Sequence, residues 1–194
     1  MEHKRLNNHW GFCLSLACLM LLTYVIDPNQ LSYQRSSVAA GAWWQIFSAN
    51  ILHTNAWHLA MNLAGLVIIM TLFPWRLSLK NLWTLFLLLS LIQGIGLFWF
   101  YPTTLGFVGL SGILHGLFAY AVVQDLRRKD KWGVILLMAL AAKIIAEQTL
   151  GPQALSSQLI GARVADESHL IGAIAGLFLG LLLPFKKGIL KTPF

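Results

Sequence analysis

The sequence predicts an all-α membrane protein with six transmembrane helices. Of its 194 residues, 57% are hydrophobic and only 11% are charged, whereas charged residues make up about 25% of an ordinary soluble domain. Six apolar runs recur along the chain between short polar segments, and a helix needs roughly 20 residues to cross a bilayer. The predicted spans are residues 10–26, 57–73, 82–101, 110–123, 134–150 and 169–185.

These six spans leave no room for a soluble domain, so residues 1–194 are predicted to form one domain. The first run follows Lys4 and Arg5 as in a signal peptide, but Asp27 and Pro28 follow it instead of a small-residue cleavage site. We therefore expect this run to be retained as a helix. The fourth run is short for a span, so its start is expected to lie below the membrane surface inside the bundle.

Basic residues are distributed unevenly between the two sides of the predicted membrane. Eleven of the 14 Lys and Arg residues fall at the two termini and in the second and fourth loops, while only Arg35 and Arg163 fall in the alternate loops. Because cytoplasmic loops carry the excess of Lys and Arg, both termini are predicted to be cytoplasmic. This bias also accounts for the net charge of +7. The basic residues form no continuous stripe, so the expected partner is the lipid bilayer and not a nucleic acid.

The chain offers no recognisable cofactor or metal motif. Cys13 and Cys18 lie in the first predicted helix and point to different sides of it, so we expect two free thiols. HExxH and CxxC spacings are missing from the sequence, and the His residues are dispersed. The glycines lie in and between apolar helices rather than in a phosphate-binding loop. We therefore expect neither a metal nor a cofactor.

Polar side chains gather at the beginnings of the second, fourth and sixth predicted helices. His58 and Asn62 stand near the start of the second helix, Ser111 and His115 near the start of the fourth, and His169 at the start of the sixth. With the N-terminus inside, all three helices begin at the outer face, which places these groups at one membrane depth. Polar groups in a membrane usually face the bundle interior or a wet cavity, so this cluster is the candidate site.

Two stripes of small residues indicate how Ser111 and His169 could meet. Small residues let transmembrane backbones approach closely, and both stripes begin beside a polar residue. The stripes are Gly112, Gly116 and Ala119 on the fourth helix, and Gly172, Gly176 and Gly180 on the sixth. Helix packing without a site is the alternative interpretation of such stripes. We expect the serine hydroxyl and the imidazole to lie within hydrogen-bond reach.

A serine and a histidine in contact are what nucleophilic catalysis by serine requires. A serine hydroxyl is a weak nucleophile until an adjacent base removes its proton. A histidine can accept that proton near neutral pH. Asp166 and Glu167 are better explained by helix capping or solvation than as a third acid. We therefore expect a dyad of Ser111 and His169.

A tetrahedral intermediate on Ser111 would also need hydrogen-bond donors for its oxyanion. The fourth helix opens directly after Gly109, so we expect a free backbone N–H at Ser111 or at one of its neighbours. His58 and Asn62 lie one turn apart on the same face of the second helix, and both side chains can donate. The alternative role for this pair is a hydrogen bond that only joins two helices.

Three stretches of the chain together resemble the rhomboid intramembrane proteases: GLSG before His115, HLAMN from His58 to Asn62, and SHLIGAIAG from Ser168 to Gly176. The resemblance covers nearly the whole chain and implies a six-helix rhomboid-like bundle with a water-filled cavity open to the outer face. It implies that Ser111 attacks the substrate and that His169 acts as its base. The groups implied to stabilise or support the site are His58, Asn62, the Ser111 backbone N–H, Gly109, Gly112, His115 and Gly172.

Two positions depart from the usual pattern of this family. Where Trp-Arg often stands in the first long loop, Trp44 is followed by Gln45, so we expect the loop to be anchored differently. Where many members carry an aromatic residue one turn after the serine, this chain has His115 on the same helix face. We expect His115 to stack on His169 rather than to act as a competing base. His53 matches a recurring histidine of the family, and its expected role is structural.

The compact form of the chain, GLSGILHG and ESHL are most similar to the rhombosortase branch of the family. This similarity implies cleavage of bacterial envelope proteins that end in a Gly-Gly segment, a hydrophobic helix and a basic tail. The implied partner is thus a transmembrane protein substrate with a C-terminal hydrophobic tail, cut at the outer interface. The implied location is the bacterial inner membrane, with the site facing the periplasm.

Lys143 and Glu147 lie one turn apart in the fifth predicted helix. Charged groups within a span usually face inward and pair with one another. We therefore expect a salt bridge between these two residues, or with Arg163 or Glu167. Control of substrate entry is the alternative role.

Two other function classes remain open for the chain. One is a catalytically inactive rhomboid-like protein that binds transmembrane segments, although that class usually lacks the serine or the histidine. The other is a small transporter, which would show polar residues through the full membrane depth and inverted repeats. Here the polar side chains cluster toward one face, which favours the protease over the transporter.

Overall fold

The computed structural model describes residues 2–73, 77–151 and 154–183, which are predominantly helical. Each predicted span corresponds to one long helix in this part of the chain, and α1 begins well before residue 10. These helices are α1 (Glu2–Leu22), α5 (Ala56–Leu72), α6 (Leu79–Phe100), α7 (Ser111–Arg127), α8 (Lys131–Leu150) and α10 (Asp166–Leu182).

Helix α7 continues beyond residue 123, where the predicted fourth span ended. The polar residues after that point have partners within the bundle. The side-chain amide of Gln124 donates to the carbonyl oxygen of Gly180 at 2.8 Å, and Asp125 pairs with Arg128 at 3.2 Å. Because these polar groups are paired, the helix can extend past the end of the apolar run. The helix therefore ends at Arg127, four residues after the predicted span.

The long helices differ in whether they could cross a bilayer unaided. Within the described residues, Asn8–Val25 (most of α1 and the turn after it), α6 and α8 are long and apolar enough to do so. Helices α5, α7 and α10 have 17 residues each, about 25 Å of helix against a hydrocarbon core of about 30 Å. The chain is a membrane protein with several apolar helices, and six complete spans stay a prediction. Residues 184–185 of the predicted sixth span lie outside the described residues.

The predicted orientation in the membrane also stays a prediction. It depends in part on the basic residues Arg76, Lys186, Lys187 and Lys191, which lie outside the described residues.

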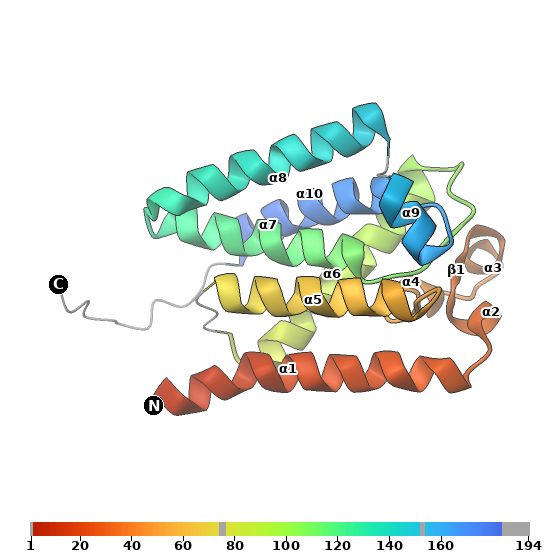
Figure 1. The fold of residues 1–194 in the computed structure, drawn as a ribbon, viewed down its shortest axis with the longest axis horizontal. Helices are drawn as coiled ribbons and strands as arrows, with labels where there is room; N and C mark the ends of the chain where they lie inside the picture. The colour runs from red at the N-terminus through yellow and green to blue at the C-terminus, as the bar shows by residue number, and fades with distance from the viewer. Residues whose placement is uncertain (1, 74–76, 152–153, 184–194) are drawn as a thin grey trace.

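Figure 1 shows α1 and α8 on opposite outer sides of the bundle, with the other long helices between them. Helices α7 and α10 make the most extensive contact between any two described elements. The short elements gather at the end of the bundle where α5, α7 and α10 begin. They are η1 (Thr23–Val25), α2 (Pro28–Leu31), α3 (Arg35–Ala39), α4 (Gln45–Ser48) and α9 (Ala154–Ile160).

The contact between α7 and α10 is possible because glycines face one another across it. A Cβ atom added to Gly172 would lie 2.0 Å from the backbone oxygen of Gly112. One added to Gly176 would lie 2.1 Å from the backbone oxygen of Gly116. Both distances are far shorter than van der Waals contact, so only glycine permits this approach. The close packing predicted from the two stripes is therefore present.

Helix α8 presents a largely apolar surface outward. Its large side chains are mostly exposed, at 52–67% for Val134, Ile135, Met138 and Ile145. Soluble proteins rarely expose a large apolar face. Lipid tails would cover this face in a bilayer, in agreement with an outer helix of a membrane bundle.

The segment between α1 and α5 is anchored through Gln45. Its side-chain oxygen accepts the N–H of Gln34 at 3.1 Å, and its amide donates to the carbonyl oxygen of Asn29 at 3.4 Å. The indole of Trp44 donates to the carbonyl oxygen of Gln30 at 2.9 Å. The residue that replaces the family's arginine thus anchors the loop by neutral hydrogen bonds.

The all-α prediction missed a small pair of strands. Strand β1 (Tyr33–Gln34) pairs antiparallel with β2 (Gly106–Phe107), and the rings of Tyr33 and Phe107 lie 5.0 Å apart. Two residues per strand are too few to leave an alternating pattern in the sequence. The pair joins the first long loop to the segment that leads into α7.

Candidate active site

The beginnings of α5, α7 and α10 converge on Ser111, the first residue of α7. His169, in the first turn of α10, lies against it, with Nε2 2.9 Å from Oγ of Ser111. The His169 side chain is only 6% exposed. The two residues predicted as nucleophile and base therefore lie at hydrogen-bond distance, although 58 positions separate them in the chain.

A carboxylate lies on the other side of this imidazole. Oε2 of Glu147, in α8, is 3.0 Å from Nδ1 of His169. Oε1 of the same carboxylate forms an ion pair with Nζ of Lys143, so the predicted salt bridge between Lys143 and Glu147 is confirmed. The second oxygen of Glu147 therefore reaches the histidine, a contact that was not expected from the sequence.

The sequence feature that could have revealed the role of Glu147 is its charge within an apolar helix. Such a group must face the bundle interior or a polar partner. Its expected partner was Lys143, one turn away on the same helix, or alternatively Arg163, and His169 was not among the expected partners. A carboxylate has two oxygens and can serve both partners, which is what the structure shows.

The partners of His169 determine where its hydrogens lie. An ionised carboxylate only accepts hydrogen bonds, so Nδ1 of His169 donates to Glu147. In the neutral ring Nε2 then carries no hydrogen and accepts the hydroxyl hydrogen of Ser111. This is the arrangement in which an imidazole can remove the proton of a serine.

His115 stacks on His169, as expected from its position one turn after Ser111. The two rings are 16° from parallel, and their centroids are 4.2 Å apart. Nδ1 of His115 lies 2.8 Å from the backbone oxygen of Ser111. Because a carbonyl oxygen only accepts, Nδ1 of His115 must donate there. This hydrogen bond holds the ring flat against His169.

His58 is fixed by the segment that precedes α5. The side-chain oxygen of Asn55 caps α5 by accepting the N–H of His58 at 2.8 Å, and the Thr54 hydroxyl donates to the carbonyl oxygen of Ile160 at 2.6 Å. The backbone N–H of Thr54 lies 3.4 Å from Nδ1 of His58. In the tautomer that accepts this N–H, Nε2 is free to donate to a ligand. The other tautomer would donate from Nδ1 to the Thr54 hydroxyl oxygen, 3.1 Å away.

His53 packs edge-on against His58, with ring centroids 4.9 Å apart and an interplanar angle of 80°. Burial first, and then the neighbouring His58, lower the pKa of His53 to about 4. Its ring is therefore neutral near pH 7 and can pack as an apolar side chain. This contact suits the structural role expected for His53.

Asn62 carries a buried hydrogen-bond donor that is unpaired among the described residues. Its Nδ2 atom has no hydrogen-bond partner among the described residues, and the side chain is 5% exposed. Leaving a buried polar group unpaired costs about 1–3 kcal/mol. A ligand that supplies an acceptor would remove this cost. Asn62 therefore has the property expected of an oxyanion donor.

Gly109 keeps the space beside these donors open. Its φ of +121° lies in the region that favours glycine. A Cβ atom at this position would lie 2.6 Å from Nε2 of His58 and 3.6 Å from Nδ2 of Asn62. The next residues begin α7, whose first backbone N–H groups, including that of Ser111, have no partner within the helix.

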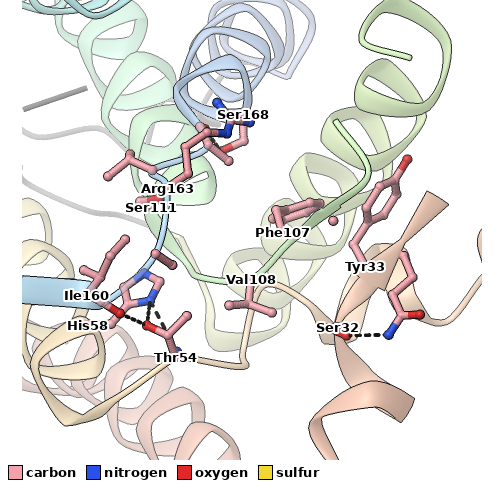
Figure 2. Close-up of a pocket in the computed structure, with 15 residues that line it drawn as sticks. Ser32, Tyr33, Thr54, His58, Phe107, Val108, Ser111, Ile160, Arg163 and Ser168 are labelled. Atoms are coloured by element: carbon pink, nitrogen blue, oxygen red, sulfur yellow. Dashed lines mark hydrogen bonds between the residues drawn. The ribbon is translucent and has the colours of Figure 1, made fainter. Parts of the chain in front are cut away.

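Two cavities meet at Ser111 and His58. The larger, of about 350 Å³, lies between the β1–β2 pair and the loop before α10. Figure 2 shows Ser111 and His58 on one side of it and Phe107 and Tyr33 on the other. The smaller, of about 200 Å³, is lined by the candidate site residues His58, Asn62, Ser111, His115, Lys143, Glu147 and His169, together with four neighbours. A ligand in the larger cavity would therefore lie beside the Ser111 hydroxyl.

The loop of residues 161–165 forms one wall of the larger cavity and is held by ion pairs. Arg163 donates to the carboxylates of Asp166, at 3.2 Å, and Glu167. Thr104 also donates to Glu167, which is buried. The N-cap residue of α10 makes no side-chain hydrogen bond. The ion pairs of Asp166 and Glu167 with Arg163 were not expected, because helix capping or solvation was the predicted role of the two carboxylates.

His115, Glu147 and His169 place three potential metal-ligand atoms within 4.8 Å of one another. A metal ion lies close to the plane of each imidazole that binds it. Because the two rings are stacked nearly parallel, one ion cannot lie in both planes. The carboxylate is also already bonded to His169 and Lys143. This arrangement does not fit a metal ion unless the rings rotate.

The fold and the site define a helical membrane protein whose interior holds a serine in contact with a histidine. Residues 40–185 match the family model described as Rhomboid domain. The match covers most of the chain, so this protein belongs to the rhomboid family. The family resemblance expected from GLSG, HLAMN and SHLIGAIAG is confirmed.

The chain is also similar to a curated plant protein, Rhomboid-like protein 11, chloroplastic, of Arabidopsis thaliana. The two are 28% identical over 150 residues, which make up 73% of this chain and 53% of the relative. The chain thus spans about half the length of this relative.

Proposed function

We propose that this protein is an intramembrane serine endopeptidase that cleaves membrane-anchored proteins near the outer membrane interface. The observation that carries the proposal is the 2.9 Å contact between Oγ of Ser111 and Nε2 of His169. It joins a hydroxyl and an imidazole from two separate helices. The pair borders cavities that a peptide backbone could enter. Membership of the rhomboid family supports the same activity.

The reaction begins when Oγ of Ser111 attacks the carbonyl carbon of the scissile peptide bond and Nε2 of His169 takes the hydroxyl proton. The tetrahedral intermediate then breaks the C–N bond, and the imidazolium gives its proton to the leaving amine. A water molecule attacks the resulting ester, with His169 again accepting the proton. The same proton returns to Ser111 as the new carboxyl end leaves. These steps need no cofactor.

The oxyanion formed on the scissile carbonyl would accept hydrogen bonds from three groups. They are the backbone N–H of Ser111, Nδ2 of Asn62 and Nε2 of His58. The unpaired state of Nδ2 in Asn62 supports this assignment, because the oxyanion supplies the acceptor that the described residues lack. His58 contributes in the tautomer whose Nδ1 accepts the N–H of Thr54.

Within the family, we assign the chain to the rhombosortase type. The substrate would be a bacterial envelope protein with a C-terminal Gly-Gly segment, a hydrophobic helix and a basic tail. The motifs GLSGILHG and ESHL support this choice. A Gly-Gly segment unwinds at little cost, which exposes the extended backbone that the serine must attack. The enzyme would lie in the inner membrane with cytoplasmic termini and a site open to the periplasm.

Co-expression with a Gly-Gly-tailed membrane reporter tests the proposal. The wild type should release the reporter from its tail, whereas Ser111→Ala and His169→Ala should leave it uncut. His115→Ala tests the neighbouring histidine. Cleavage that survives His169→Ala but is lost in His115→Ala would reverse the assignment of the base.

The same experiment distinguishes the protease from an inactive rhomboid-like protein. An inactive protein would co-purify with the reporter but leave it intact, and Ser111→Ala would change nothing. A second reporter that lacks the Gly-Gly segment tests the finer assignment. Equal cleavage of both reporters would retain the protease and reject the rhombosortase type.

A further inference from the structure

We propose that Glu147 is a positioning residue for His169, so that the site is a Ser–His–Glu triad assembled from α7, α10 and α8. The inference rests on the proposed function of Ser111 and His169. It goes beyond the expected dyad by assigning a role to a charged residue of an outer helix.

The first support is the direction of the two hydrogen bonds on the imidazole. Nδ1 of His169 lies 3.0 Å from Glu147, and Nε2 lies 2.9 Å from Ser111. Glu147 can only accept, so it selects the tautomer in which Nε2 faces the serine without a hydrogen. It also provides a negative charge beside the imidazolium that forms when His169 takes the proton. These are the two functions of the orienting acid in a serine protease triad.

The second support is burial. The side chains of His169 and Glu147 are 6% and 12% exposed, so little water competes for the hydrogen bond between them. A hydrogen bond that involves an ionised group is about twice as strong as one between neutral groups. The bond is therefore strong enough to hold the imidazole in one orientation, unlike a bond on an exposed surface.

The third support is that the other charged groups around His169 cannot take this role. Asp166 and Glu167, on the same helix, bond to Arg163. His115, from α7, covers one face of the ring, and His58, from α5, lines the same cavity as His169. Lys143, from α8, is cationic and bonds to Glu147. Among the described residues, Glu147 is thus the carboxylate that bonds to the ring of His169.

Helix stabilisation alone does not explain the position of Glu147. An i,i+4 pair between Lys143 and Glu147 is worth only about 0.2–0.5 kcal/mol on a helix surface. The Lys143 side chain is 52% exposed, and its ammonium uses Oε1. Oε2 remains directed at His169. The lysine and the histidine therefore bind different oxygens of one carboxylate.

The test measures how fast a fluorophosphonate labels the purified full-length protein between about pH 5 and pH 9, the range in which a histidine titrates. The variants are Glu147→Gln, Glu147→Asp and Ser111→Ala. Gln148→Leu is the matched control, because Gln148 is the next residue and also bonds α8 to α10, through the backbone oxygen of Asp166. It does not touch the imidazole.

Glu147→Gln should slow labelling by about 10²-fold, within the loss of up to about 10⁴-fold caused by removing the orienting charge in a soluble serine protease. The pH profile of its labelling rate should differ from that of the wild type, because a neutral amide replaces the carboxylate beside the imidazole. Glu147→Asp keeps the charge at a longer distance and should recover part of the rate. Gln148→Leu should keep the pH profile of the wild type and label within about threefold of its rate.

The outcomes separate this inference from the proposed function. Labelling that is abolished in Ser111→Ala but unchanged in rate and pH profile in Glu147→Gln would retain the protease and overturn the triad. An equal loss in Gln148→Leu would show that Glu147 only docks α8 on α10, which also overturns the triad. Labelling that is unaffected by Ser111→Ala would instead reject the proposed function itself.

Discussion

Helices α7 and α8 follow one another in the chain and both carry residues of the candidate site, yet different interactions hold them in the bundle. Helix α7 is buried along most of its length and packs backbone to backbone against α10. The buried residues of α8 are Gly133, Leu140 and Ile144, and its remaining apolar face is largely exposed. Its contact with the site comes mainly from Glu147.

This difference teaches that the two hydrogen bonds of His169 depend on different parts of the fold. The bond to Ser111 is fixed by glycine contacts that leave the two backbones little freedom. The bond to Glu147 depends on the position of an outer helix. Substitutions at the contact between α7 and α10 should therefore abolish the site. Substitutions in α8 should only reduce the activity.

The largest expected effect comes from Gly172→Val, which disrupts the close backbone contact between α7 and α10. Its Cβ would lie 2.0 Å from the backbone oxygen of Gly112, so α7 and α10 must separate. We expect a loss of stability above about 4 kcal/mol and no labelling of Ser111. Thermal unfolding in detergent and fluorophosphonate labelling measure both effects.

Gly11→Ala is the matched control, because a Cβ atom there would meet nothing within 4 Å. It should leave stability and labelling close to the wild type. A Gly172→Val protein that unfolds at the wild-type temperature would show that the backbone contact is not required.

A smaller effect on the rate is expected from Asn62→Leu, which keeps the packing but removes the unpaired donor. The rate of reporter cleavage should fall by about 10²–10³-fold, the usual cost of losing one oxyanion donor. Stability should stay the same or rise slightly, because a buried amide without a partner disappears. Cleavage and thermal unfolding should thus change independently. Asn81→Leu, at an exposed position early in α6, is the control and should change neither.

The smallest expected effect comes from Arg163→Met, in the loop between α9 and α10. It leaves the buried Glu167 without its cation, although Thr104 still donates to that carboxylate. Because Arg163 is 58% exposed and screened by solvent, we expect a loss of only about 1–2 kcal/mol, seen as a lower unfolding temperature. Lys80→Met, in an exposed position, is the control. Equal unfolding temperatures for the two variants would mean that the ion pairs do not hold the loop.

Much of the site could be predicted from the sequence because its signals are local. Ser111 begins α7 and His169 lies in the first turn of α10, each on a helix with a glycine stripe, and the predicted topology places both helix starts at one membrane depth. His58 and Asn62 share a helix face by simple periodicity. The stacking of His115 on His169 followed from the same spacing and is confirmed.

The role of Glu147 could not be predicted in the same way. Helix α8 is apolar nearly all round, so its sequence does not indicate which face turns toward α10. Local spacing pointed to Lys143, and only the packing of the helices brings the second oxygen to His169. The ion pairs of Arg163 were missed for a similar reason, because they depend on how the loop folds back on α10.

The measurement that tests the central claim most directly is the site of fluorophosphonate attachment in the purified wild-type protein, located by peptide mass spectrometry. We predict one adduct, on Ser111, and none in folded Ser111→Ala. An adduct on another cavity serine, such as Ser156 or Ser168, would contradict the claim. So would the absence of any adduct from a correctly folded wild-type protein.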